Sequence, residues 1–319
     1  MEVKKTHNGA ECNERLDCAI LGAGPAGLTA LTYLARFHRH AVALGYHVMR
    51  PRLLLIDRTY NLPGYPEGVP GDVLLQRLRT QAEEMGGAVR TTTAQRVEGR
   101  DGDFTVHLEE GSPLRARKII LAMGVRDQEP DIPGIGAHVG DFVRYCPVCD
   151  GYEHTGKRLG ILGSGPAVAR HALFLRTFSE HITVFLHGQS RDTLGRYNDI
   201  LSRNGIACHE SRVVHVLEER GDAASEHRGR GICLEDGSEH PLAVLYSALG
   251  CHVNLAPVRD LGLSLDDEGY IVTGIDQRTC VPGVYAAGDI TSQLNQISIA
   301  FGQAAVAAIN LHNELFDEA

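Results

Sequence analysis

The chain has 319 residues, 43% of them hydrophobic, and a net charge of −9. This length exceeds the ~250 to 300 residues at which single cores stop growing, so it is enough for two ordinary domains. Basic residues form no run, which excludes nucleic acid as an expected partner, because phosphate binding needs clustered Lys and Arg. The first 17 residues are polar and hold no apolar signal core, so we expect a cytoplasmic protein.

In chain order, the first predicted unit is a strand over 17–21, a glycine turn over 22–27, and a helix to about residue 37. The uncharged stretch 18–35 reaches the ~18-residue threshold for a membrane helix. Three glycines and a proline interrupt it, which favours a strand, a tight turn and a buried helix. We therefore expect no membrane span.

The glycine turn has the pattern of a dinucleotide-binding fingerprint. Gly22 permits the tight turn, Gly24 lets the backbone approach a pyrophosphate, and Gly27 lets the helix pack closely against the strand. Pro25 and Ala26 complete the turn at the start of the helix, whose N-terminus supplies partial positive charge. The turn thus predicts a site for a cofactor pyrophosphate.

We predict the next strand over 53–56, ending at Asp57, whose carboxylate would accept hydrogen bonds from ribose hydroxyls. The interval from Gly27 to Asp57 is 30 residues. The fingerprint usually spans ~20 residues, so an insertion is expected over about 38–50.

Further along, a helix is predicted over 72–86 and strands over 104–108 and 119–122, the latter ending at Met123-Gly124. The pattern then restarts with a strand over 159–162, a turn at Gly163-Ser164-Gly165, a helix over 167–178 and a strand over 182–186. Near the end, "VPGVYAAGD" predicts a strand that exposes Gly288-Asp289, before a long helix of small residues. Two glycine turns of this kind predict an α/β chain with two Rossmann-like nucleotide-binding folds.

The second turn departs from the fingerprint. Val168 stands where a third Gly or Ala would let the helix pack, and Leu186, His187 and Gly188 follow the next strand. Neither a carboxylate for an NADH ribose nor an arginine for an NADPH 2′-phosphate occurs there. Arginines 191 and 196 either reach back to a ligand or are solvated loop charges. We predict a nucleotide-binding fold that lacks its usual ligand.

Of eight cysteines, Cys146 and Cys149 alone form a CxxC pair. A zinc site would need further ligands, and two unpaired cysteines would be buried small residues. A redox disulfide is favoured, because the two-residue spacing closes a tight ring and Cys146 is placed to act as the attacking thiolate. Asp150, next to Cys149, can carry the proton that thiol chemistry exchanges.

These motifs together carry a family resemblance. The glycine fingerprint, then "CPVCDG" directly ahead of a second nucleotide turn, then "VPGVYAAGD", resemble the low-molecular-weight thioredoxin reductases over residues 17–315. The resemblance implies a discontinuous FAD-binding domain, 1–124 and 252–319, interrupted by a second Rossmann-like domain, 125–251, that carries the disulfide. It also implies a homodimer and a thioredoxin-like protein or small disulfide as substrate.

By the same resemblance, Cys149 would face the flavin and Cys146 would exchange with the substrate disulfide. Asp150 would be the acid-base, Asp289 would contact the FAD ribityl or phosphate region, and Gln296 would lie near the flavin ring. Gly124 and Gly288 are further candidates for cofactor contact. Asn295 departs from the family, which has arginine at this position.

The altered second turn and the Leu186-His187-Gly188 end of its strand make NADPH a doubtful donor. The chain looks closest to relatives that take electrons from ferredoxin or carry a second FAD at the usual NADPH site, which would use Gly163, Ser164, Gly165 and His187. The alternatives are an ordinary NADPH-dependent reductase and a small-molecule dithiol oxidase. Asp150 argues against the oxidase, since such relatives have His after the second cysteine. A non-catalytic sensor would have lost a cysteine or the fingerprint.

Overall fold

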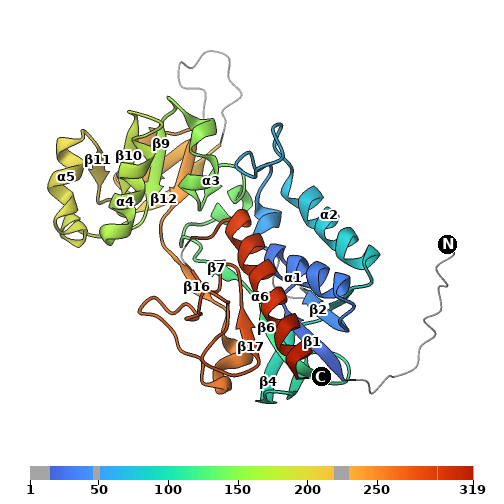
Figure 1. Cartoon of the computed structure of the whole chain (residues 1–319). Coiled ribbons are helices and arrows are strands. Elements are labelled where there is room, and N and C mark those ends of the chain that lie inside the picture. The colour runs from blue at the N-terminus through green and yellow to red at the C-terminus, as the bar shows by residue number, and fades with distance from the viewer. Residues whose placement is uncertain (1–14, 46–50, 219–229, 293, 319) are drawn as a thin grey trace.

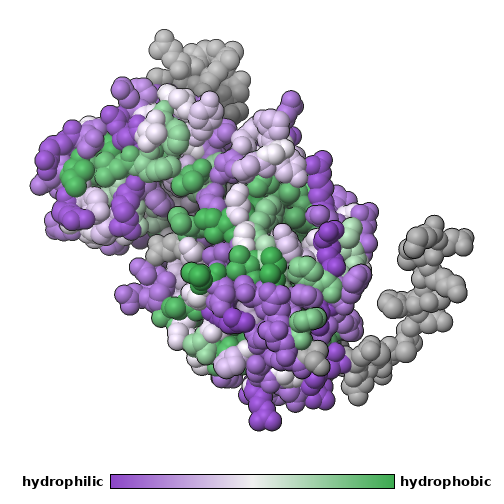
Figure 2. Space-filling view, in the orientation of Figure 1, coloured by the Kyte–Doolittle hydropathy of each residue, from purple (hydrophilic) through white to green (hydrophobic). Residues whose placement is uncertain are grey.

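Two lobes, each built on its own sheet, organise the chain (Figure 1). The computed structural model describes residues 15–45, 51–218, 230–292 and 294–318. Among these residues, no helix combines the length and apolar character that a bilayer crossing needs. Figure 2 shows hydrophobic patches on both lobes and in the middle of this view, set in largely hydrophilic surface.

The first sheet has seven strands in the order β3-β2-β1-β6-β5-β4, with β17 also paired to β6. Strand β6 is long enough to pair antiparallel with β5 at its start and parallel with β17 at its end. Strands β2, β1 and β6 are parallel neighbours. The strands are β1 (Leu16–Leu21), β2 (Ala41–Gly45), β3 (Ala88–Thr91), β4 (Ala94–Arg100), β5 (Asp103–Leu108), β6 (Leu114–Leu121) and β17 (Val284–Ala286).

Three helices cover one face of this sheet: α1 (Pro25–Arg36), α2 (Gly71–Glu84) and α6 (Ile297–Asp317). Alternate side chains of β1 point to opposite faces, as strand geometry requires. Cys18 and Ile20 therefore join the core under the helices, whereas Ala19 and Leu21 join the core on the other face. Helix α6 lies beside α1 (Figure 1), which brings the end of the chain back to its start.

The prediction of a second strand over 53–56 is wrong. Those residues form a short 3₁₀ helix, η1 (Arg52–Leu55), and the second strand is β2 (Ala41–Gly45), inside the segment taken for an insertion. Gly27 and the end of β2 at Gly45 are 18 residues apart, close to the ~20 of the fingerprint, so no insertion precedes β2. Residues 46–50 of the predicted insertion lie outside the described residues.

The second sheet has five parallel strands in the order β11-β10-β9-β15-β8. Helices α4 (Gly165–Leu175) and α5 (Tyr197–Arg203) pack against it, and β12 (Val213–Leu217), β13 (Gly231–Leu234) and β14 (Glu239–Pro241) form a small antiparallel sheet on its other side. The five strands are β8 (Val143–Arg144), β9 (Leu159–Leu162), β10 (Ile182–Phe185), β11 (Ala207–His209) and β15 (Val244–Ser247).

A two-stranded antiparallel ribbon joins the lobes: β7 (Val125–Asp127) pairs with β16 (Cys251–Val253). The chain leaves the first sheet after β6 through β7 and returns through β16 before β17 (Figure 1). The second Rossmann-like unit is thus inserted into the first, and the predicted α/β fold class is confirmed.

Candidate functional site

The first glycine turn is built by two close approaches. Gly22 has φ +117°, and a Cβ at this position would lie 2.1 Å from the carbonyl oxygen of Ala122. A Cβ at Gly27 would lie 1.9 Å from the carbonyl oxygen of Gly22. Only glycine allows both contacts. Helix α1 therefore begins directly at the end of β1.

A pocket extends from this turn to the CxxC segment. The residues predicted for the FAD site and for the redox disulfide all line it, except Gly27, which is buried behind the turn, and Asp57. The pocket-lining residues among the predictions are Gly22, Gly24, Pro25, Ala26, Gly124, Cys146, Cys149, Asp150, Gly288, Asp289 and Gln296. Fingerprint, disulfide and C-terminal motif therefore share one cavity.

The pocket fits FAD. A Cβ built at Gly24 or Gly124 would meet no atom within 4 Å, so the backbone is open to a ligand at both positions. Gly24 also precedes α1, and no side chain caps the helix N-terminus, which leaves its partial positive charge for a pyrophosphate. Asp289 and Gln296 line the same cavity, and Gln296 contacts the disulfide.

Asp57 is exposed and lies outside the lining residues of this pocket. It follows η1 rather than a strand, so the argument that made it a ribose ligand no longer applies. The strand that does precede the ribose position in the fingerprint, β2, ends at Gly45, which lines the pocket without a carboxylate.

Sequence reasoning missed Arg52, a pocket residue in η1. Its guanidinium donates to both carboxylate oxygens of Asp127 at 2.8 Å and to Asp289 at 3.0 Å. Burial raises the pKa of Asp127 and of Asp289, while Arg52 lowers it. With its amide turned over, Asn295 also accepts from Arg52 at 3.0 Å. Arg52 therefore brings a fixed positive charge next to two pocket carboxylates.

The CxxC cysteines form a disulfide, with a Cα–Cα distance of 5.3 Å. The interpretations of the pair as free structural cysteines or as zinc ligands are therefore wrong for this state of the protein. Gln296 Nε2 donates to the Sγ atoms of Cys146 and Cys149 at 3.5 and 3.6 Å. Asn61 donates to Gln296 Oε1 at 3.1 Å and so orients its amide. Gln296 thus links α6 to the disulfide.

Asp150 ends the short helix α3 (Pro147–Asp150) that carries Cys149. Its carboxylate accepts a hydrogen bond from the Tyr246 hydroxyl at 2.8 Å, and Arg144 Nε lies 3.5 Å from its other oxygen. Burial raises the pKa of Asp150, although Tyr246 and Arg144 lower it. An acid beside a redox cysteine, with its proton affinity raised, is suited to proton transfer.

The second glycine turn lies apart from this pocket. Gly163, Ser164 and Gly165 connect β9 to α4, and none of them lines the pocket. His187 has φ +52° and its Nδ1 accepts from the amide of Val213 at 3.1 Å. Burial lowers the pKa of His187, which favours the neutral ring. The candidate residues of a second nucleotide site thus cluster in the second lobe.

Both arginines suggested for this second site have partners within their own lobe. The Arg191 guanidinium donates to the carbonyl of Cys208, and its amide donates to Glu210 at 2.6 Å. Arg196 is exposed and stacks over the ring of Tyr197 at 5.2 Å. Val168, at the third position of the motif, is fully buried in the core under α4.

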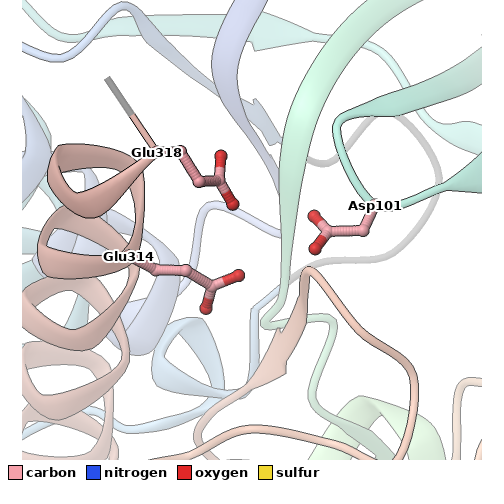
Figure 3. Close-up of side chains that lie close together, drawn as sticks. All are labelled: Asp101, Glu314 and Glu318. Atoms are coloured by element: carbon pink, nitrogen blue, oxygen red, sulfur yellow. The ribbon is translucent and has the colours of Figure 1, made fainter.

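Asp101, Glu314 and Glu318 converge on one point (Figure 3), as the ligands of a metal ion would. That point is taken by the ammonium group of Lys118, which is fully buried in β6 and bonds to all three carboxylates. The cluster is therefore an ion-pair network that fastens α6 to the first sheet. Within the described residues it is the single group of this kind, so the expectation of no metal site stays a prediction.

Comparisons with known proteins agree with this geometry. Residues 16–304 match the family model described as "Pyridine nucleotide-disulphide oxidoreductase". Thioredoxin reductase of Treponema pallidum is 28% identical over 302 residues, which cover 92% of this chain and 94% of that protein.

Two solved structures extend the comparison. The crystal structure of thioredoxin reductase from Streptococcus pyogenes has a TM-score of 0.85 at 25% identity, covering 96% of this chain and 99% of that one. The atypical thioredoxin reductase TRi from Desulfovibrio vulgaris Hildenborough is 31% identical, with a TM-score of 0.53, covering 96% of this chain and 99% of that one. The similarity extends over both lobes.

Proposed function

The chain belongs to the pyridine nucleotide-disulphide oxidoreductase family, as a thioredoxin reductase-like, flavin-dependent disulfide oxidoreductase, and from this premise we propose its electron path. Electrons pass from FAD through Cys149 and Cys146 to the disulfide of a thioredoxin-type partner. The observation that carries the proposal is the single cavity lined by the fingerprint turn and by both cysteines.

The division of labour follows the resemblance. FAD would be held by residues 1–124 and 252–319, with residues 125–251 as the inserted domain. Gly22 and Gly24 would face the pyrophosphate, and Asp289 with Arg52 would face the sugar chain. When bound, FAD supplies an electron pair. The homodimer stays a prediction.

The chain's own residues supply the thiols and the acid of the exchange. The electron pair breaks the Cys146–Cys149 bond, and Asp150 gives a proton to one of the released sulfurs. The Cys146 thiolate then attacks the partner disulfide, forming a mixed disulfide and releasing one partner thiolate. Asp150 then takes the proton back from Cys149, whose thiolate attacks Cys146, restoring the intramolecular disulfide and releasing the second partner sulfur as a thiolate. Gln296 contacts both sulfurs in the disulfide state from which the exchange starts.

We propose further that the donor is ferredoxin or a second FAD rather than NADPH. The second turn supports this, because Arg191 is bonded within its own lobe and no carboxylate follows β10 at Leu186, His187 or Gly188. A 2′-phosphate is held best by a bidentate arginine. An adenine nucleotide with its phosphates on Gly163-Ser164-Gly165 fits a second flavin better than NADPH.

The test is an absorption spectrum of the purified protein, with released flavin counted per chain. Two FAD per chain support a second flavin site. One FAD with rapid anaerobic bleaching by NADPH assigns the protein to the NADPH-dependent reductases. Correctly folded, colourless protein that takes up no FAD contradicts the proposal altogether.

Cysteine variants test the order of electron transfer. Cys146→Ser leaves Cys149 free beside the flavin and should strengthen a thiolate-to-flavin absorption band. Cys149→Ser should abolish that band, because only the sulfur facing the flavin couples to the ring. Identical spectra for the two variants contradict the assigned roles.

A further inference from the structure

A buried tyrosine hydroxyl points at the acid beside the disulfide. Tyr246 in β15 is fully buried and is one of the two largest fully buried side chains among the described residues. Its hydroxyl donates to Asp150 Oδ1 at 2.8 Å. A buried tyrosine hydroxyl needs a partner, and a backbone carbonyl usually meets that need. Here the partner is the carboxylate that follows Cys149.

Other charged groups face Asp150 from each neighbouring element. Arg144 of β8 lies 3.5 Å from Oδ2 but also donates to the carbonyl of Asp141 at 2.8 Å, so its guanidinium is shared. Glu153 of η3 (Tyr152–His154) adds negative charge that raises the pKa of Asp150. His154 packs against Tyr246, and burial lowers its pKa to about 4, so the ring is neutral at pH 7. Tyr246 therefore approaches the Asp150 carboxylate more closely than Arg144 does.

Burial and Glu153 favour the protonated acid, whereas Tyr246 and Arg144 favour the anion. A proton carrier that cycles must be able to take up and release its proton near the working pH. An acid with only burial around it would keep its proton. The hydroxyl of Tyr246 counteracts that effect, and its donor atom also fixes one carboxylate oxygen in space.

We propose that Tyr246 is a positioning residue for Asp150, which holds the carboxylate and opposes the effect of burial, so that Asp150 both takes up and releases the proton of the disulfide exchange. The inference rests on the proposed acid-base function of Asp150. Tyr246 itself need not touch a reacting atom.

The experiment measures reduction of the Cys146–Cys149 disulfide by dithiothreitol in the full-length holoprotein, from pH 5 to 9. A dithiothreitol thiolate attacks Cys146, Cys149 leaves and takes a proton from Asp150, and the second dithiothreitol thiol closes its own ring to release Cys146. Thiols are counted by alkylation and mass spectrometry. Dithiothreitol is the only reductant, so the result does not depend on the physiological donor, and the flavin absorbance records any electrons that pass from the cysteines to the flavin.

Tyr246→Phe removes one hydrogen bond to the anion, so the pKa of the Asp150 carboxyl should be higher in the variant than in the wild type. The ratio of the variant's rate constant to the wild-type value should then rise about tenfold between the acidic and alkaline ends of the range. In an Asp150→Asn background the ratio should not vary with pH.

Tyr285→Phe is the matched control. Tyr285 is also fully buried, and its hydroxyl donates to a carboxylate, Glu314, in the other lobe. The ratio of the Tyr285→Phe rate constant to the wild-type rate constant should be independent of pH. Should Tyr246→Phe fold poorly, 3-fluorotyrosine at position 246 keeps the ring and makes the hydroxyl a stronger donor, and the ratio should then fall with pH.

A pH-independent ratio for Tyr246→Phe, or the same pH dependence in the Asp150→Asn background or in Tyr285→Phe, overturns the inference. If Asp150→Asn leaves the wild-type pH profile unchanged, the acid-base role fails and the inference fails with it. If Asp150→Asn changes the profile and Tyr246→Phe does not, only the role of Tyr246 fails.

Discussion

The two glycine turns of this chain share a design but differ in how closely their parts approach. In the first lobe, a Cβ at Gly22 would lie 2.1 Å from the carbonyl oxygen of Ala122, whereas at the equivalent Gly163 it would lie 3.0 Å from that of Ala248. The third position is Gly27 in the first turn and the fully buried Val168 in the second. The turn with the closer approach is also the one that lines the pocket containing the disulfide.

The comparison separates a glycine motif from a working site. Both turns follow a buried parallel strand and open a helix. In the first turn, helix and strand approach so closely that the third position has no room for a side chain. In the second turn, the helix stands back enough for the valine side chain.

Alanine at the third position of each turn should destabilise the protein for opposite reasons, by overpacking at Gly27 and by leaving a cavity at Val168. Gly27→Ala puts a methyl group 1.9 Å from the Gly22 backbone, and such overpacking should cost about 3 kcal/mol and remove retained flavin. Val168→Ala removes two buried methyl groups, which should cost about 2 kcal/mol and leave flavin bound. Urea unfolding and flavin release after denaturation measure both effects. Flavin loss in Val168→Ala alone would reverse the comparison.

The success and failure of the sequence predictions have a physical explanation. Apolar runs ended by glycines located β1, α1, β9 and α4 to within three residues at most boundaries. The same criterion chose residues 53–56 over 41–45 as the second strand, because short apolar runs of either kind look alike and an acidic residue followed the wrong one. Residues 41–45 are identified as the second strand by their parallel pairing with β1, which is seen only in the folded structure.

Arg52 and Tyr246 were beyond local prediction for a similar reason. Arg52 bonds to partners 75 and 237 residues away, and Tyr246 bonds to a partner 96 residues away. Neither spacing has a periodic signal. The cysteines and Asp150 could be predicted from the sequence because the residues that carry their chemistry lie next to one another in the chain.

The next prediction compares an arginine of each lobe. Arg52→Met leaves Asp127 and Asp289 facing each other in the pocket, and their partial exposure limits the expected cost to about 2 kcal/mol. Flavin retention should fall, since the pocket loses positive charge opposite an anionic cofactor. Arg191→Met should leave flavin retention unchanged, because its guanidinium bonds to a backbone carbonyl of the second lobe. Equal retention in both variants would contradict a role for Arg52 in cofactor binding.

Acidification should affect the second lobe first. Burial lowers the pKa of four of its histidines, and the described residues of the first lobe contain one such histidine, His312. The four are His154, His171, His187 and His240. A histidine whose pKa is lowered by folding contributes fully to the stability of the folded protein only above its unfolded pKa of ~6.5. This contribution is lost as the pH falls from there towards the folded pKa, which is about 4 for His154.

The expected loss at pH 5 is on the order of 1 kcal/mol, reduced by the partial exposure of these rings. Hydrogen exchange at pH 5 and 7 should show protection falling in β9, β10 and β15 before β1 and β6. His154→Gln should lessen the difference. Uniform loss of protection in both sheets would show that the histidines do not act on one lobe.

The smallest effect comes from Gly124 and Gly250, the glycines directly before β7 and β16. Gly124 and Gly250 both have positive φ, and a Cβ at either would meet no atom within 4 Å, so alanine should cost each site a similar ~1 kcal/mol of backbone strain. The two differ in that only Gly124 lines the pocket. Gly124→Ala should therefore release flavin a few-fold faster, since ~1 kcal/mol corresponds to about a fivefold change. Gly250→Ala should match the wild-type rate, unless a flavin occupies the second lobe, in which case a second, faster-released fraction should appear. Stopped-flow mixing with denaturant-free apoprotein trap resolves these rates, and equal acceleration in both variants would show that the strain, rather than the pocket, controls release.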